Sequence, residues 1–407
     1  MQDFFKAEKV ADNVYWVGAV DWNVRNFHGY KTGRGSTYNA FLVIDEKVTL
    51  IDTVKAPFLH EMLARISSVI DPSKIDYIVS NHSEPDHSGA LAMTIEAVKP
   101  EKVFASPMGE KALKAYYGDL GVTVVKTGES ISLGKSAVSF VETKMLHWPD
   151  SMVTYLDSAK MLFSQDAFGM HLAGSRLWAD EYDRSVLEHE ARKYFANILN
   201  LQAAKVLDLL KALPTLNLDI RTVAPDHGPL WRRPEDIKWI LDLYFDCATQ
   251  APRPYALVAY STMWHSTEKL ANTIADGIRS TGVEVKVADL AVNDRSAIMT
   301  DVAKAGAVAF GAPTMNNQMF PAMADVLTYI KGLRPKNKLG LAFGSFGWSG
   351  EGAKQIAAEL EAMNIPQPVP MFQVKYMPTE ADLEKAFESG AALGRALLAG
   401  VAESTTK

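Results

Sequence analysis

The stretch Asn81-His82-Ser83-Glu84-Pro85-Asp86-His87 decides how the first half of this chain is read. It follows the apolar segment 77–79 and precedes a helical pattern over 88–98, so it lies at the end of a strand, where loops carry function. In extended chain the alternate side chains of His82, Glu84 and Asp86 point the same way, and His87 can turn to a second metal. The stretch therefore indicates a site for two metal ions. The competing interpretation is that polar residues gather here because loops are polar.

Three later positions favour the metal interpretation, because each also follows a strand-like run. They are His147 in Met145-Leu146-His147-Trp148-Pro149-Asp150, Asp166 in Ser164-Gln165-Asp166, and His227 in Ala224-Pro225-Asp226-His227-Gly228. The complete set contains four imidazoles and three carboxylates. Such a hard, anionic ligand set favours iron over zinc, although affinity alone would favour zinc over Fe(II).

In order and approximate spacing, these residues resemble the metallo-β-lactamase superfamily, whose loop reads His-x-His-x-Asp-His and is followed by His, Asp and His ligands. One position departs from that pattern, because Glu84 stands where the superfamily has its second histidine. The resemblance implies an αββα fold for the first half, in agreement with its short strands and intervening helices.

The predicted pattern of secondary structure changes at Ala251-Pro252-Arg253-Pro254, where two prolines follow a long helical pattern. Beyond this linker, strand-like and helical segments alternate almost regularly. Five buried-type strands over about 150 residues predict a doubly wound, flavodoxin-like parallel sheet. We therefore expect two α/β domains, residues 1–250 and residues 251–407.

Three loops of the second half have the chemistry of a flavin site. Hydroxyl residues precede the first helix, where free backbone N–H groups cradle a phosphate, although an ordinary helix cap would use the same residues. The other two loops follow the third and fourth strands at the same edge of the sheet, and Trp264 or Trp348 can stack on a ring. The predicted FMN contacts are Thr262, Met263, Trp264, His265, Ser266, Thr267, Pro313, Thr314, Met315, Asn316, Asn317, Ser345, Phe346, Gly347, Trp348, Ser349 and Gly350. Flavodoxins usually have glycines in the first loop, where Met263 and His265 stand here.

Together the two halves resemble the flavodiiron proteins, in which the glutamate form of the metal loop precedes a flavodoxin-like domain. The resemblance implies an oxidoreductase with a non-haem diiron site and FMN, which reduces O2 to water or NO to N2O. By the same resemblance, one iron would be held by His82, Glu84 and His147, the other by Asp86, His87 and His227, with Asp166 as the bridge. It also implies a head-to-tail homodimer that places the FMN of one chain beside the irons of the other.

Three further residues are candidates for proton donation next to the irons. His28 and His171 are placed there because some family members have a histidine in such positions, and Tyr194 is a weaker candidate of the same kind. Plain packing is the alternative for each of them.

Composition sets limits on the other functions. The net charge of -6 gives no reason to expect a nucleic-acid or membrane partner, and no apolar run approaches the ~20 residues needed to cross a bilayer. The start of the chain lacks a secretory pattern, so we expect a cytoplasmic protein. The single cysteine, Cys247, excludes a rubredoxin-like centre on this chain, so a separate rubredoxin or similar one-electron donor is implied. The main rival is a metallo-β-lactamase-fold hydrolase with an appended flavodoxin domain.

Overall fold

The computed structural model describes residues 4–405 and divides the chain into two compact units. The first unit comprises the chain up to Phe27 together with Thr32–Tyr194 and Ala204–Phe245. The second comprises His28–Lys31, Phe195–Ala203 and the chain from Asp246 onward. Each unit is α/β, and each builds its own core.

The first unit contains two packed sheets and a two-stranded pair, β3-β4. One sheet has the order β1-β2-β5-β6-β7-β8-β9 and the other β10-β11-β12-β13-β14. The strands are β1 (Glu8–Ala11), β2 (Val14–Trp16), β3 (Ala19–Asp21), β4 (Ser36–Tyr38), β5 (Phe41–Val43), β6 (Thr49–Ile51), β7 (Tyr77–Ser80), β8 (Lys102–Ala105), β9 (Val122–Val124), β10 (Ser130–Ser132), β11 (Ala137–Glu142), β12 (Met152–Leu156), β13 (Met161–Gln165) and β14 (Thr222–Pro225). The helices are α1 (Leu59–Ser67), α2 (Pro85–Ser88), α3 (Leu91–Val98), α4 (Pro107–Tyr117), α5 (Arg184–Tyr194), α6 (Ala203–Ala212) and α7 (Pro234–Thr249).

The two sheets of this unit enclose an apolar layer that includes Phe41, Val79, Phe140 and Phe163. The opposite face of the seven-stranded sheet packs on helices α1, α3 and α4 through a second apolar cluster. Strand β7 is buried along its whole length and pairs in parallel with β6 and β8. A strand that is covered on both faces needs a continuous apolar run, which explains residues 77–79. Its end delivers the Asn81–His87 stretch to one edge of the sheet.

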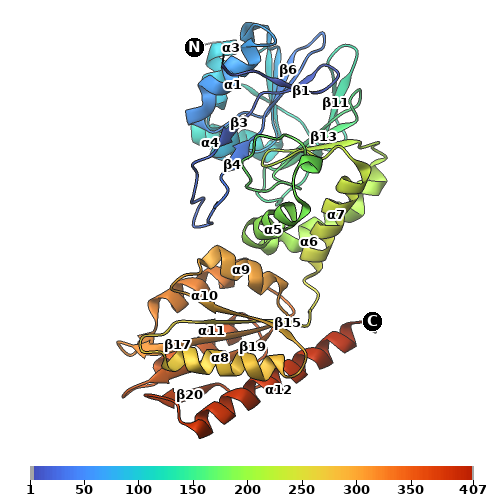
Figure 1. Ribbon diagram of the computed structural model, residues 1–407. Coiled ribbons are helices and arrows are strands. Elements are labelled where there is room, and N and C mark those ends of the chain that lie inside the picture. Colours follow the sequence, from blue (N-terminus) through green and yellow to red (C-terminus); the bar gives the residue numbers. More distant parts are fainter. Residues whose placement is uncertain (1–3, 406–407) are drawn as a thin grey trace. The chain divides into compact units, whose positions relative to one another are not determined.

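The second unit is a sheet of order β16-β15-β17-β19-β20 with all pairs parallel, and β18 pairs antiparallel with β17. Helices α8 and α12 cover one face side by side, and α9, α10 and α11 cover the other (Figure 1). This is the predicted doubly wound, flavodoxin-like sheet. The strands are β15 (Tyr255–Tyr260), β16 (Glu284–Asp289), β17 (Ala307–Met315), β18 (Gln318–Met319), β19 (Leu339–Phe346) and β20 (Phe372–Lys375). The helices are α8 (Ser266–Arg279), α9 (Arg295–Lys304), α10 (Pro321–Leu333), α11 (Glu351–Ala362) and α12 (Glu380–Thr405).

The structure corrects several predicted boundaries. Strands β17 and β19 run on to Met315 and Phe346, so the first parts of two predicted flavin loops are strand. They continue because parallel pairing extends to Pro313↔Ser345. The helical pattern over 88–98 is two helices, and Asp86 and His87 lie on the helical turn α2 rather than in extended chain. Helix α12 reaches Thr405, and residues 406 and 407 lie outside the described chain.

Candidate metal centre and flavin cavity

Seven side chains from the ends of several strands meet in two adjacent groups in the first unit. His82 and Glu84 follow β7, His147 lies between β11 and β12, and the remaining ligand candidates follow β13 and β14 or lie on α2. One group contains His82, Glu84, His147 and Asp166, and the other contains Asp86, His87 and His227. In each group the potential ligand atoms all lie within 4.8 Å of one another. The structure therefore brings together all seven residues that the sequence singled out.

Asp166 faces both groups. Its Oδ2 lies 3.3 Å from His82 Nε2 and 3.1 Å from His147 Nε2. Its Oδ1 lies 3.2 Å from His87 Nε2, and 3.5 Å from Nε2 of His227. One carboxylate oxygen thus points to each group, which is the arrangement that a bridging ligand needs.

Atoms without a hydrogen-bond partner test whether metal ions fit this site. Buried polar atoms are nearly always paired in folded proteins, so each exception needs an explanation. Among the described residues, the buried atoms without a hydrogen-bond partner include His82 Nε2, His87 Nε2, Asp166 Oδ1 and both carboxylate oxygens of Asp86. They belong to both groups, and metal coordination would satisfy all of them. The residues present therefore fit two cations.

Two imidazoles, those of His82 and His227, are oriented from behind by an acceptor at Nδ1, which leaves Nε2 for a metal. Asp150 Oδ2 lies 2.9 Å from His82 Nδ1 and also accepts from the Ser83 backbone. The Thr37 carbonyl lies 2.6 Å from His227 Nδ1. Asp226 Oδ2 lies 3.5 Å from His87 Nδ1. The sequence alone does not reveal these supporting contacts, although Asp150 and Asp226 stand within the motifs quoted for their neighbours.

A buried polar contact fixes the start of the metal loop. Asp52, which follows β6, accepts hydrogen bonds from the Asn81 backbone N–H and from its side-chain amide, both at 2.7 Å. The side-chain oxygen of Asn81 in turn accepts a hydrogen bond from Thr154 Oγ1 at 2.6 Å. Strands β6, β7 and β12 are thereby tied together directly before His82.

The electrostatics of the site favour positive charge. Burial by itself lowers the pKa of His87, but the carboxylates of Asp86 and Asp166 outweigh it and raise the pKa to about 10. For His147, burial likewise lowers the pKa, and hydrogen bonds to Asp166 and Glu84 raise it to about 9. The same carboxylates that stabilise a proton on these rings would stabilise a metal cation in its place.

Of the three candidate proton donors, two lie against the metal centre. The His171 ring is 4.5 Å from that of His227 and 5.1 Å from that of Tyr194, and His171 Nδ1 lies 2.8 Å from Ser36 Oγ. Burial and the neighbouring His227 hold the pKa of His171 well below its ordinary value. Burial and Asp166 raise the pKa of the Tyr194 phenol. By its contacts, His28 belongs to the second compact unit, whereas His171 and Tyr194 belong to the first.

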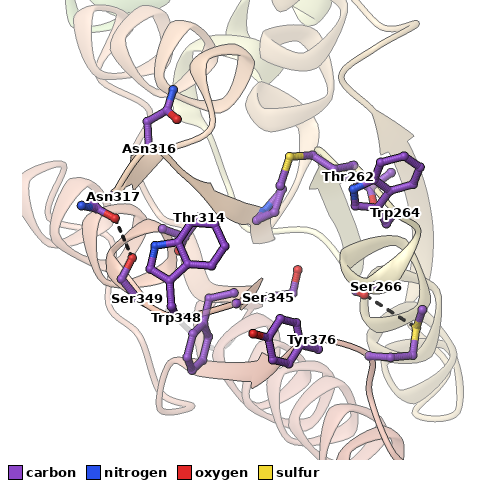
Figure 2. Close-up of a pocket in the computed structure, with 15 residues that line it drawn as sticks. Thr262, Trp264, Ser266, Thr314, Asn316, Asn317, Ser345, Trp348, Ser349 and Tyr376 are labelled. Carbon is purple, nitrogen blue, oxygen red and sulfur yellow. Dashed lines mark hydrogen bonds between the residues drawn. The ribbon is translucent and has the colours of Figure 1, made fainter.

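The second unit has a cavity of about 460 Å³ at the carboxyl ends of its strands, where ligands bind in doubly wound sheets (Figure 2). Figure 2 shows Trp264 and Trp348 on different sides of this cavity, and their side chains are 81% and 85% exposed. Ser349 Oγ donates to the Asn317 side-chain oxygen at 2.9 Å, which links two of the predicted loops. The volume and the aromatic walls suit a flavin.

Most predicted flavin contacts line this cavity, but His265, Thr267, Met315 and Gly350 do not. His265 instead hydrogen-bonds Glu268 through Nδ1 at 2.5 Å, and Thr267 Oγ1 bonds Ser345 Oγ at 2.8 Å. Two lining residues were missed, Tyr376 and Met377. Their position after the fifth strand was the available signal, because that strand ends at the same edge of the sheet.

Two hydroxyl groups test the fit of a phosphate. Among the described residues, Ser261 Oγ and Thr262 Oγ1 are buried and have no hydrogen-bond partner. Both lie directly after β15 and before the N-terminus of α8, where a phosphate accepts hydrogen bonds. FMN therefore fits the cavity and the adjoining loop.

Within residues 4–405, no helix combines the length and apolar character that a membrane crossing requires.

Comparisons with known proteins agree with both sites. Residues 37–228 match the model of the ODP family beta lactamases, and residues 258–390 match that of the flavodoxins. The chain is 46% identical to a rubredoxin-oxygen oxidoreductase of Megalodesulfovibrio gigas, over 98% of this chain and 100% of that protein. It is 42% identical to a nitric oxide reductase of Moorella thermoacetica, over 97% and 98% of the two chains. This chain superposes on the crystal structure of the flavodiiron protein from Giardia intestinalis with a TM-score of 0.94. The two sequences are 36% identical, and the match covers 98% of this chain and 99% of the Giardia chain. The chain belongs to the flavodiiron protein family.

Proposed function

We propose that this protein is an oxidoreductase that reduces O2 to water, NO to N2O, or both, with electrons from a rubredoxin-like carrier. The observation that carries the proposal is the Asp166 carboxylate, which presents one oxygen to each of two buried ligand groups. The flavin cavity in the second unit and the oxidoreductase relatives support it. None of the relatives named above is a hydrolase, so the hydrolase alternative is not favoured.

We assign the seven ligands to two irons, following the two groups of side chains described above. His82, Glu84 and His147 would hold one ion, Asp86, His87 and His227 would hold the other, and Asp166 would be shared. When bound, the irons supply Lewis-acid and redox chemistry, and FMN accepts and passes on single electrons. Glu84 is the position that separates this ligand set from the His-x-His-x-Asp-His loop of the metallo-β-lactamase superfamily.

The residues around the ligands fix their orientation and protonation. Asp150 and the Thr37 carbonyl select the tautomers of His82 and His227 that keep the proton on Nδ1 and free Nε2 for coordination. The Asp150 carboxylate stays ionised at neutral pH. Burial alone would raise its pKa, but the hydrogen bond with His82 lowers it to about 2.

We also propose that Tyr194 and His171 handle protons beside the ligand sphere. The raised pKa keeps the Tyr194 phenol protonated at neutral pH, so its oxygen holds a proton that it can donate in a hydrogen bond. The lowered pKa keeps His171 neutral, so its ring is a hydrogen-bonding group rather than a cation. The role of His28 remains a prediction.

Three finer assignments complete the proposal: a separate rubredoxin as donor, a head-to-tail homodimer, and a cytoplasmic location. The single cysteine supports a donor on another chain. The homodimer is tested by measuring turnover against protein concentration, where a fully active monomer at high dilution would contradict it. Cell fractionation tests the location.

The decisive experiment measures iron and flavin on protein purified without oxygen, followed by O2 and NO consumption with reduced rubredoxin. We expect two irons and one FMN per chain and turnover of at least one of the two gases. Asp157→Asn, an exposed carboxylate in the β12–β13 turn, is the matched control for ligand substitutions. Two zincs per chain, or the absence of flavin, would refute the proposal.

A further inference from the structure

The first unit also has a cavity beside the metal centre, since two of its wall residues, Thr37 and Gly228, adjoin His227. It measures about 190 Å³, and its walls include Trp16, Trp22, Thr37, Arg65, Arg176 and Gly228. All these residues belong to one compact unit, and none of them is a proposed iron ligand. We call this site the arginine cavity.

Arg65 on helix α1 supplies a buried donor to this cavity. Its Nη1 donates to the Lys6 carbonyl at 2.6 Å, and its Nη2 pairs with Glu61 at 2.7 Å. Its Nε is buried and has no hydrogen-bond partner among the described residues. The guanidinium lies 4.6 Å from the Trp16 ring, which holds its plane in place. Of the five N–H donors of this fixed guanidinium, the Nε–H is therefore left for a ligand.

Arg176 brings a second positive charge to the same walls. Within residues 4–405 it makes no ion pair with a carboxylate, whereas its own carbonyl accepts from Tyr182 Oη at 2.5 Å. One carboxylate, that of the exposed Glu8, also lines the cavity. Glu61 already pairs with Arg65, whereas Arg176 has no carboxylate within salt-bridge distance among the described residues, so its guanidinium favours an anionic ligand.

The lining also contains flat and apolar side chains, beside the polar Thr37, Ser175 and Tyr182. Trp16 and the half-exposed Trp22 stand with Val20, Leu172 and Leu177 around the cavity. Such a surface favours a ligand with a planar hydrocarbon body over a compact, fully hydrated ion.

From these contacts we infer that the arginine cavity binds a small monocarboxylate with a flat apolar body. The carboxylate accepts hydrogen bonds from Arg65 Nε and from the Arg176 guanidinium. The body packs against Trp16 and Trp22. The inference does not rest on the proposed reductase activity, since no iron ligand takes part.

Benzoate is the probe, measured by calorimetric titration of the full protein carrying its iron and FMN. We expect one saturable site, with benzamide, a neutral molecule of the same shape, binding at least ~10-fold more weakly. Arg176→Gln and Arg65→Gln should each lower the affinity for benzoate by about tenfold or more. Arg221→Gln, an exposed arginine of the same unit outside the cavity, should change nothing.

Carboxylates also coordinate iron, so Asp166→Ala distinguishes the two sites. Binding that persists in Asp166→Ala and weakens in the arginine variants supports the inference. Lack of saturable binding, equal affinity in Arg176→Gln and the unaltered protein, or loss of binding in Asp166→Ala alone would overturn it. If Arg65→Gln fails to fold, Arg176→Gln and Trp22→Ala decide, because both of those side chains are outside the core.

Discussion

At the scale of single residues, Asp166 has the largest expected effect. Its two oxygens contact histidines of both ligand groups, and it is almost completely buried. Replacing Asp166 with Ala should release most of the iron while FMN stays bound, because the flavin cavity belongs to the other compact unit. Metal and flavin analysis of the purified variant checks this. Two retained irons would show that Asp166 is not the shared ligand.

Lys338 is a second residue with a definite expected effect. It is 3% exposed, and its Nζ donates to the Ala303 carbonyl at 3.0 Å. Burial, with a smaller effect of Arg253, lowers its pKa from 10.5 to about 7. Between pH 7 and pH 10.5, Lys338 is therefore protonated in the unfolded chain and largely deprotonated in the folded chain. The free energy of unfolding should therefore rise with pH from about 7 to 10.5 and be insensitive to this group below pH 7.

Lys338→Met should remove that pH dependence and stabilise the second unit by about 1–3 kcal/mol at neutral pH. Urea unfolding at pH 6.5 and pH 9.5 measures both effects. Lys336→Met, at an exposed neighbouring position, is the control and should leave the pH dependence in place. An unchanged slope in Lys338→Met would contradict the argument.

The ligand residues could be predicted from the sequence because they stand in the segments that follow apolar strands and carry side chains with metal-ligand chemistry. The residues behind them could not. Asp52 and Thr37 act on the site across long sequence separations, and a single sequence contains no signal of such pairing. Tyr376 could have been found, since it follows the fifth strand at the edge where the flavin loops meet.

At the scale of elements, two glycines of the second unit show how much the space beside a backbone position matters. A Cβ on Gly311 in β17 would lie 2.1 Å from the Phe343 ring of β19, whereas nothing lies within 4 Å of the corresponding position at Gly332 in α10. Gly311→Ala should destabilise the second unit by about 1–3 kcal/mol through overpacking. Gly332→Ala should stabilise it by roughly 0.5–1 kcal/mol, because alanine favours a helix interior. Denaturant unfolding compares the two, and equal effects would contradict this packing argument.

Element types were easier to predict than element ends. Helix α10 begins and ends at the predicted residues because Pro321 opens it and Arg334 closes it in a left-handed conformation. Strand β17 runs past its predicted end, because the hairpin with β18 and the pairing with β19 supply partners that local sequence does not reveal. Helix α2 was missed because a single turn is too short for a periodic pattern.

At the scale of the whole molecule, the two cofactor sites lie in separate compact units. Each cofactor should therefore stabilise its own unit. FMN at about 100 times its dissociation constant should add about 2.7 kcal/mol to the second unit and little to the first. Calorimetry of protein stripped of iron, of FMN, or of both measures this. A single transition that responds equally to either cofactor would show that the units unfold as one.

The buried ligand atoms that lack hydrogen-bond partners have a consequence for the life of the protein in the cell. A chain that has not received its iron keeps several desolvated nitrogen and oxygen atoms in the middle of its first unit, each at a free-energy cost. The first unit therefore depends on iron from outside the chain for its full stability. When iron is scarce, newly made copies should open more often and be degraded sooner, so that abundance follows iron supply without a dedicated regulator.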